Sequence, residues 1–512
     1  MDSIIEPRAA LKNSTPAQTP DSKKAAYCFW YTISDQDGVA KDVKIDNLIL
    51  IELLYDNNYR RYDLENESIF VKLTQNRIIK HTTITEMQDF IFDYIDNLPE
   101  DLENEGNGRI RQLIKRKVLQ GVNNYFNEKK LYLLKSKEDI KLNKDTIDAK
   151  YIYFQNGYLE IKRASIKLMS YKSLTGYIWE KEIINREFVL PKEDEKRNYV
   201  KRFFELVAGA NRYKDLCIAA GYYIHDFYDY KLKALILTDS SISDGNEANG
   251  RTGKTLFCKL LAGALSSDPN DTAIKTYCEI NAKDFDAKEK HKYGAASLET
   301  KLIVLNDLKR NFDVDTIYND VTDGITVDKK GLQPFKIRCK IILTTNKTIR
   351  LQGDSDLDRF LEFEFSNYFS ANHTPENEFK HWFFRDWNNE DYCRYYYFLA
   401  QCCQMYFANN LKLNQPLQIN LNKRKLKEQT SPEFLEWIEN KNIVSGQKYV
   451  KSDLYKEFIE AAPDFNTPAF KQRRFAEWLK SYLDYSDEWL NYNKQENEPR
   501  DSTTKYFVFL RK

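Results

Sequence analysis

Apolar and polar residues follow different patterns in successive parts of the chain, and the patterns predict different structures. Between 26 and 150 they alternate in short runs such as IFVKLTQNRIIKH, which predict a small α/β module. At 151–161 two alternating runs meet at Asn156-Gly157, a dipeptide typical of two-residue hairpin turns, so a β-hairpin is expected. From about 235 to 370, continuous apolar runs separate helical patterns, as in an α/β region with a parallel sheet.

Helical patterns lie on both sides of this α/β region. One covers 194–230, and another begins after 368 with HWFFRDWNNEDYCRYYYFLAQCCQMYF. The aromatic residues of the second pattern are expected to pack in a core, with a base-stacking surface as the alternative. A polar stretch over 412–432 then predicts a linker to a separate C-terminal module.

The C-terminal module contains three helical patterns and a final strand, KYFVFL. Ser452 is expected to cap the second helix. In the third helix Phe475, Trp478 and Leu479 form an apolar stripe. The basic residues that lie off this stripe are Lys471, Arg473, Arg474 and Lys480. Three helices and a hairpin make a winged-helix-like domain, which binds a DNA groove through its third helix or serves protein contacts only.

Composition narrows the class of protein. Hydrophobic residues make up 42% and charged residues 30% of the 512 residues, values typical of a soluble globular protein of several domains. The net charge of +1 means that nucleic-acid binding would require local basic patches. The eight cysteines form no CxxC pair and are expected to be free thiols. Neither a signal peptide nor a membrane span is apparent, so no membrane partner and a cytoplasmic location are expected.

The clearest chemical motif follows the apolar run LKALILTD. A polar loop leads to Gly253-Lys254-Thr255, which opens an amphipathic helix in the strand, loop and helix order of a phosphate-binding loop. Inward-facing backbone amides, the Lys254 ammonium and the Thr255 hydroxyl would hold phosphates and Mg²⁺. The first glycine of GxxxxGK[ST] is replaced by Ala248, and Gly250 follows two residues later. The residues predicted to bind ATP are Asn249, Gly250, Arg251, Thr252, Gly253, Lys254, Thr255 and Leu256.

Two more apolar runs end in polar residues suited to the same site. LIVLNDL (302–308) places Asp307 at a strand end, where it would bind Mg²⁺ with Thr255 or polarise the attacking water, or would merely cap the strand. KIILTTN (340–346) ends in Asn346, whose amide could hold the water. Catalytic roles are therefore predicted for Lys254, Asp307 and Asn346.

The segment 321–337 predicts a β-hairpin whose turn carries Lys329, Lys330 and Gly331, and Arg359 then enters another apolar strand. This order of motifs resembles superfamily 3 helicases, the ring-forming AAA+ helicases of small viruses, phages and plasmids, and among them the phage and poxvirus-type primase–helicases. The likeness is strong over 235–370 and weak over 110–235 and 430–510.

The resemblance implies an α/β fold with an AAA+ P-loop ATPase core, an α-rich N-terminal region and a C-terminal winged-helix-like domain. It implies ATP and Mg²⁺ as cofactors, and as partners DNA, further copies in a homohexamer, and a separate primase or polymerase. Lys329 and Lys330 would line the pore and bind DNA. Arg359 would be catalytic in a neighbouring subunit's site, with Arg350 as the competing residue. No paired acids of a primase site appear between 26 and 150.

The expected regions are a disordered leader (1–25), an accessory α/β module (26–150), a hairpin and helical collar-like region (151–234), the ATPase core (235–370), a helical extension (371–411), a linker (412–432) and the winged-helix-like domain (433–512). The leading hypothesis is an ATP-dependent DNA helicase that replicates a phage, plasmid or other mobile element. The alternatives are an ATPase that remodels or senses a partner, and a DNA-binding replication initiator with a degenerate ATPase.

Overall fold

The computed structural model describes residues 28–37, 39–63, 68–98, 110–134, 140–192, 198–209, 211–228, 232–240, 251–266, 276–283, 285–309, 312–349, 351, 354–486, 488–501 and 504–512. The predicted leader, together with Asn249, Gly250 and Arg350, lies outside these residues. The chain divides into two compact units, one within 1–144 and 169–183 and the other within 145–168 and 184–512.

The first unit combines small sheets with helices. Its helices are α1 (Asn47–Asp56), α2 (Ile84–Asp96), α3 (Ile110–Gln120), α4 (Val122–Tyr125) and α5 (Glu128–Leu131). Its strands are the antiparallel pair β1 (Trp30–Ser34) and β2 (Ala40–Ile45), and a sheet in the order β3 (Tyr59–Asp63), β4 (Ser68–Leu73), β5 (Ile78–His81) and β9 (Ile178–Trp179). Helix α2 shows why these helices form: Thr83 and Glu86 make a capping box, and Met87, Ile91 and Ile95 are buried at helical spacing.

The second unit begins with the predicted hairpin. Strands β6 (Ala149–Phe154) and β7 (Gly157–Lys162) pair antiparallel with Phe154 opposite Gly157. The predicted hairpin is confirmed, but its two-residue turn is Gln155-Asn156, one residue earlier than predicted, and Gly157 is already part of β7. They belong to a sheet in the order β10 (Ile183–Ile184), β6, β7 and β8 (Ser165–Met169). The chain between β8 and β10 belongs to the first unit, and it contains short 3-10 helices at Tyr171–Ser173 and Glu180–Glu182.

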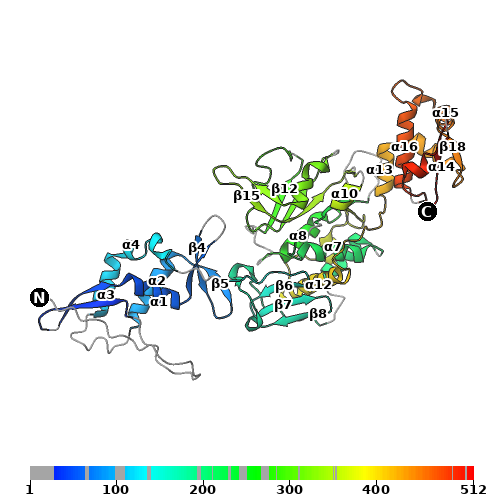
Figure 1. Cartoon of the computed structure of the whole chain (residues 1–512). Helices are drawn as coiled ribbons and strands as arrows, with labels where there is room; N and C mark the ends of the chain where they lie inside the picture. Colours follow the sequence, from blue (N-terminus) through cyan, green and yellow to red (C-terminus); the bar gives the residue numbers. More distant parts are fainter. Residues whose placement is uncertain are drawn as a thin grey trace. The chain divides into compact units, whose positions relative to one another are not determined.

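A five-stranded parallel sheet forms the centre of the second unit (Figure 1). Its order is β12 (Tyr277–Asn281), β13 (Leu302–Asn306), β16 (Lys340–Thr344), β11 (Ala234–Asp239) and β17 (Phe360–Phe365). Both faces are buried: in β11, Leu235 and Leu237 belong to one core cluster, whereas Ala234 and Ile236 belong to another. The fold is therefore mixed α/β with a parallel sheet. Strand β16, which ends near Asn346, lies between β13, which precedes Asp307, and β11, which precedes the phosphate-binding loop.

Helices cover the sheet and link its strands. They are α6 (Tyr199–Ala208), α7 (Tyr213–Ile224), α8 (Lys254–Ala264), α9 (Tyr318–Thr322), α10 (Asp354–Arg359), α11 (Pro375–Phe379) and α12 (Asn389–Ala408), with a 3-10 turn at Val314–Ile317. Helices α6, α7, α8 and α12 share one core with the sheet. Tyr392, Tyr395, Tyr396 and Phe398 of α12 are buried there, which confirms that most of this aromatic stretch is core.

The C-terminal part contains helices and a small sheet around its own core (Figure 1). The helices are α13 (Leu421–Gln429), α14 (Pro432–Asn440), α15 (Lys451–Ala461), α16 (Gln472–Tyr485) and α17 (Lys494–Asn497), with a 3-10 turn at Pro463–Phe465. The sheet has the order β18 (Lys448–Val450), β20 (Thr504–Val508) and β19 (Arg500–Asp501). Phe475, Trp478 and Leu479 of α16 are buried, which confirms the predicted stripe.

The predicted cap at Ser452 is wrong. Helix α15 begins at Lys451, and its N-cap is Val450, which has extended backbone angles and makes no side-chain cap. The chain passes directly from β18 into α15, so Ser452 is already inside the helix. Its hydroxyl donates to the Asp453 carboxylate instead.

None of the described helices has both the length and the apolarity needed to cross a membrane.

Candidate functional site

Gly253 sets the position at which α8 begins. Its φ of +101° is in the left-handed region, and a Cβ atom there would lie 2.9 Å from the ring of Phe203. Both the backbone angle and the close packing therefore require glycine. Lys254 follows as the first residue of α8, and the free N–H groups of a helix start attract anions.

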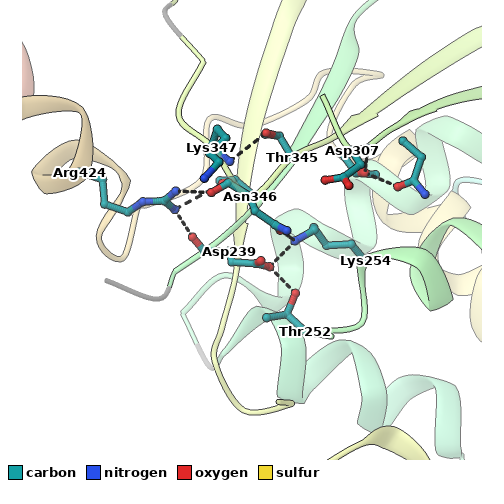
Figure 2. Close-up of polar contacts among 11 residues, drawn as sticks. Asp239, Thr252, Lys254, Asp307, Thr345, Asn346, Lys347 and Arg424 are labelled. Atoms are coloured by element: carbon teal, nitrogen blue, oxygen red, sulfur yellow. Dashed lines mark hydrogen bonds and ion pairs between the residues drawn. The ribbon is translucent and has the colours of Figure 1, made fainter. Parts of the chain in front are cut away.

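The Lys254 ammonium is held by side chains from two neighbouring strands (Figure 2). Its Nζ donates to Oδ1 of Asp239, which ends β11, at 2.5 Å, and to Oδ1 of Asn346, just beyond β16, at 2.6 Å. The side chain of Lys254 is only 11% exposed. Burial lowers the pKa of Lys254, and the charge of Asp239 opposes that shift. A phosphate entering here would compete with two side-chain oxygens for this cation.

Asp239 was not predicted as a site residue. It is 2% exposed, accepts a second hydrogen bond from the Thr252 hydroxyl through Oδ1, and its Oδ2 has no hydrogen-bond partner among the described residues. The sequence does carry a signal, because Asp239 is the first acid after the apolar run that precedes the loop. Its side chain connects the loop residue Thr252 to Lys254.

Asp307 lies at the same edge of the sheet, directly after β13. Its φ is +66°, a conformation that Asp tolerates, and its N–H donates to the Thr344 hydroxyl at 3.0 Å. The carboxylate is 41% exposed and pairs with Lys283 at 2.8 Å. The neighbouring Asn306 is less available, because its amide donates to Glu279 and accepts from Thr344. Asp307 is thus the accessible acid of the Asn306-Asp307 pair.

The region predicted as a linker contributes a residue to this edge. Arg424 of α13 donates to the main-chain oxygen of Asp239, and its Nη2 donates to that of Asn346 at 3.0 Å (Figure 2). Lys425 makes a buried ion pair with Glu362 of β17 at 2.5 Å. The structure therefore places α13 against the strand ends, although its sequence, LNKRKLKEQ, is mostly polar.

A cavity of about 1000 Å³ opens beside these residues. One part is formed by the start of α8 and the strand ends, including Arg251, Thr252, Gly253, Lys254, Thr255, Leu256, Asn306, Asp307 and Asn346. Another is formed by 374–376 and 382–385, together with Ala262 and Gly263 of α8. Its volume is at the upper end of the range common for small-molecule sites. The structure thus brings the described residues of the predicted loop together with Asp307 and Asn346.

Three other predicted residues lie away from this cavity. Arg359 ends α10 just before Phe360, which pairs with Ala234 at the beginning of β11, so Arg359 is at the opposite edge of the sheet from Asp239. Its Nη1 donates to the Ser355 carbonyl, and its guanidinium lies 4.8 Å from the ring centre of Tyr318.

Lys329 and Lys330 lie in the turn of the predicted hairpin, which is confirmed. Strands β14 (Ile325–Val327) and β15 (Phe335–Ile337) pair antiparallel. Lys330 is exposed and Lys329 is half-buried.

Comparisons with known proteins give limited matches. The model of a family of unknown function, DUF5906, matches residues 247–359. No curated protein matches. Among solved structures, two A-form apo structures of the NrS-1 C-terminal region have TM-scores of 0.38 and 0.40 at 13% identity, and each alignment covers 91% of this chain and 100% of the other. A candidate ATPase of Cytophaga hutchinsonii has a TM-score of 0.21 at 12% identity, over 56% of this chain and 80% of the other.

Proposed function

We propose that the protein is an ATP-dependent DNA helicase of the superfamily 3 type, with an AAA+ P-loop core over 235–370. The observation that carries the proposal is the meeting of Lys254, Asn346 and Asp307 around one cavity, each from a different element of the parallel sheet region. The strand order supports it, since β16 lies between β11 and β13, as the corresponding strand does in AAA+ folds. A role in the replication of a phage, plasmid or other mobile element, in the cytoplasm of its host, is part of the same proposal.

The geometry supports a division of roles at the phosphates. Lys254 is a point charge for the β- and γ-phosphates, and the amides at the start of α8 bind their oxygens. Asn346 holds the attacking water, and Asp307 polarises it. The Thr255 hydroxyl and the Asp307 carboxylate both line the cavity and would hold Mg²⁺, which prefers oxygen ligands and would neutralise phosphate charge. The donor chemistry of the residues present therefore fits this ion.

Contacts outside the cavity are assigned to other copies and to DNA. Since Arg359 lies at the opposite edge of the sheet from Asp239, we assign it to the site of a neighbouring subunit in a homohexamer. Lys329 and Lys330 on the β14–β15 turn would bind the phosphates of a DNA strand in the pore. The C-terminal part is proposed to be winged-helix-like, with the exposed Arg473 and Arg474 of α16, and Lys471 just before it, facing DNA.

One observation favours the second candidate, a DNA-binding initiator with a degenerate ATPase. Superfamily 3 and other AAA+ enzymes commonly have two acids at the end of the strand that corresponds to β13. This chain has Asn306 at the first of these positions, and its amide is hydrogen-bonded to Glu279 and Thr344. Asp307→Asn separates the candidates. If Asp307 acts in hydrolysis, the variant should bind ATP but turn it over at least about a hundredfold more slowly. Asp358→Asn, an exposed acid before Arg359, is the control.

The main test is ATP hydrolysis and strand displacement by the full chain. Wild type should hydrolyse ATP and unwind a forked duplex, and Lys254→Ala should lose both. Lys214→Ala, an exposed lysine on α7, should lose neither. Hydrolysis without unwinding would favour an ATPase that remodels a partner, whereas the absence of nucleotide turnover would favour the initiator.

The hairpin is tested with Lys329→Ala combined with Lys330→Ala. DNA stimulation of hydrolysis and strand displacement should be lost, and the salt dependence of DNA binding should flatten. Lys336→Ala, an exposed lysine on β15 outside the turn, is the matched control. Unwinding that persists in the double variant would remove the hairpin from the pore. Collapse of the rate without DNA would place the lysines at the nucleotide site or a subunit interface.

A further inference from the structure

The cavity extends well beyond the part next to Lys254. Ala262 and Gly263 of α8 line it as well as Lys254, and nine residues of helix correspond to about 13 Å. The wall over 382–385 is Trp382-Phe383-Phe384-Arg385, in contrast to the charged and amide groups around Lys254. Small residues on the helix leave room beside this wall. A triphosphate alone would leave this part of the cavity unfilled.

The wall is fixed relative to the phosphate loop by its two phenylalanines. The ring of Phe383 lies 5.9 Å from that of Phe203, the same ring that packs against Gly253. Phe384 has a φ of +65°, an uncommon conformation for a bulky residue, and its ring packs on Trp387 at 4.8 Å. Both rings therefore pack against the core while also lining the cavity, and this packing fixes the turn over 383–385.

Helix α12 adds a second attachment to α8. Tyr395, which also packs on Phe384 at 5.7 Å, donates its hydroxyl hydrogen to the Leu260 carbonyl of α8 at 2.5 Å. The wall and the helix that begins with Lys254 are thus parts of one packed unit. A ligand that bridges them would meet a site already in place.

Trp382 is different from its neighbours because it is not packed in the core. Trp382 is 49% exposed, and its ring packs on no other aromatic ring of the described residues. Its backbone N–H donates to Asp386 at 2.7 Å, and Asp386 also holds Arg385 at 3.0 Å. The Arg385 guanidinium lies 4.8 Å from the Trp382 ring centre. The Trp382 indole therefore lies at the cavity, with its backbone anchored by Asp386 and the Arg385 guanidinium against its ring.

We propose that this wall is a subsite for the purine base of a nucleoside triphosphate, with the base stacked on Trp382. The assignment rests on the proposed nucleotide site at Lys254. Stacking of a base on an aromatic side chain is sequence-tolerant and strong enough to be measured, and a purine offers the larger ring for it. The nearby guanidinium adds a further π contact.

The test compares two ligands that share phosphates but differ in the base. Binding of ATP and of inorganic tripolyphosphate to the full chain is measured by calorimetry with Mg²⁺ present. Trp382→Ala should weaken ATP about ten- to a hundredfold and leave tripolyphosphate unchanged. Trp382→Phe should keep most of the ATP affinity. Lys254→Ala should weaken both ligands. Tyr368→Ala, an exposed aromatic outside the cavity, is the control and should weaken neither.

Each contrary outcome has a distinct meaning. Unchanged ATP binding by Trp382→Ala, with both ligands weakened by Lys254→Ala, overturns the base subsite and leaves the nucleotide site standing. Equal weakening of both ligands by Trp382→Ala also overturns it, because the tryptophan then supports the phosphate loop. If wild type binds neither ligand, the proposed function fails and the subsite with it. Thermal unfolding of each variant verifies that a loss of binding is not a loss of fold.

Discussion

Two buried lysines lie at opposite edges of the parallel sheet, and they hold their charges in different ways. Lys254 lies at the carboxyl edge, where its partners are the side chains of Asp239 and Asn346 and a cavity is adjacent. Lys340 begins β16 at the amino edge and is 3% exposed. Its Nζ donates to the main-chain oxygens of Tyr222 and His225 at the end of α7, where helix carbonyls favour a cation.

Charged residues also surround Lys340, but they are paired with one another, and Lys340 does not line the cavity. Asp226 pairs with Lys301 at 2.9 Å, and Asp145 pairs with Lys150 at 3.0 Å with both side chains buried. Burial lowers the pKa of both lysines, and that of Lys340 falls to about 7. A perturbed lysine therefore does not identify a binding site by itself. What distinguishes Lys254 is that its partners are side-chain oxygens next to a cavity, which a ligand's oxygens could replace.

The largest effect on stability is expected at the amino edge, where Lys340 lies. Lys340→Ala should lower the free energy of unfolding by about 3 kcal/mol or more, because it leaves a cavity and two buried carbonyls without their donor. Urea unfolding measures the loss. No second side-chain substitution should restore stability, since the partners are main-chain atoms. Near-wild-type stability would show that water replaces the ammonium and that this edge is open.

At the carboxyl edge the stability cost should be smaller and reversible. Lys254→Ala leaves the buried Asp239 carboxylate without its cation and should cost about 1–3 kcal/mol. Adding Asp239→Asn should recover most of that stability but no ATP hydrolysis. A double-mutant cycle over the two positions gives their coupling. Independent, additive effects would mean that Lys254 and Asp239 do not interact as an ion pair in solution.

The sequence predicted the elements that meet at the carboxyl edge better than the contacts between their side chains. Apolar runs and the Gly253-Lys254-Thr255 helix start are local signals, so the strands near Asp307 and Asn346 and the beginning of α8 could be located. The interaction of Asp239 with Lys254 could not, because it depends on where a loop returns the chain. The positions proposed for Arg359, Lys329 and Lys330 in a ring stay predictions.

The polar segment before the C-terminal part was the hardest to predict. Helix α13 has few apolar residues, and it docks through charges on β17. Glu362 pairs with Lys425, and Glu364 accepts from the backbone N–H groups of Ile419 and Asn420. The two acids of FLEFEF alternate with apolar residues along β17, and the charged segment covers the face that carries them. Both acids are buried, which the alternation alone does not indicate.

Arg424 makes the carboxyl edge partly resemble the amino edge, since it too binds main-chain carbonyls. Arg424→Gln should reduce ATP turnover about tenfold, because the strand ends that carry Asp239 and Asn346 lose a shared donor. Arg424→Lys should not restore it, as one ammonium lacks the forked geometry that reaches both carbonyls. Steady-state kinetics measure the effect, with Lys423→Gln, its exposed neighbour, as the control. Full activity in Arg424→Gln would limit α13 to a structural role.

The smallest expected effect is the pH dependence of the unfolding free energy that Lys340 causes at the amino edge. Desolvation lowers the pKa of Lys340 to about 7 in the folded protein, compared with 10.5 for a free lysine. Between these values the unfolded chain holds a proton that the folded protein has released. Stability must therefore rise with pH in this range, by at most about 1.4 kcal/mol per pH unit from this group. Below the folded pKa the pH dependence from this group vanishes, because both states are then protonated.

Lys340→Met removes this titration and keeps a side chain of similar length. The difference in unfolding free energy between wild type and Lys340→Met should therefore shift in favour of wild type between pH 7 and pH 8, by no more than about 1.4 kcal/mol. Lys214→Met corrects for the loss of a surface lysine. A difference that does not change with pH, because the amine stays charged in the folded state at pH 8, would contradict the lowered pKa. The main-chain carbonyls and nearby acids would then outweigh burial, and the two edges of the sheet would differ only in whether a ligand can reach the cation.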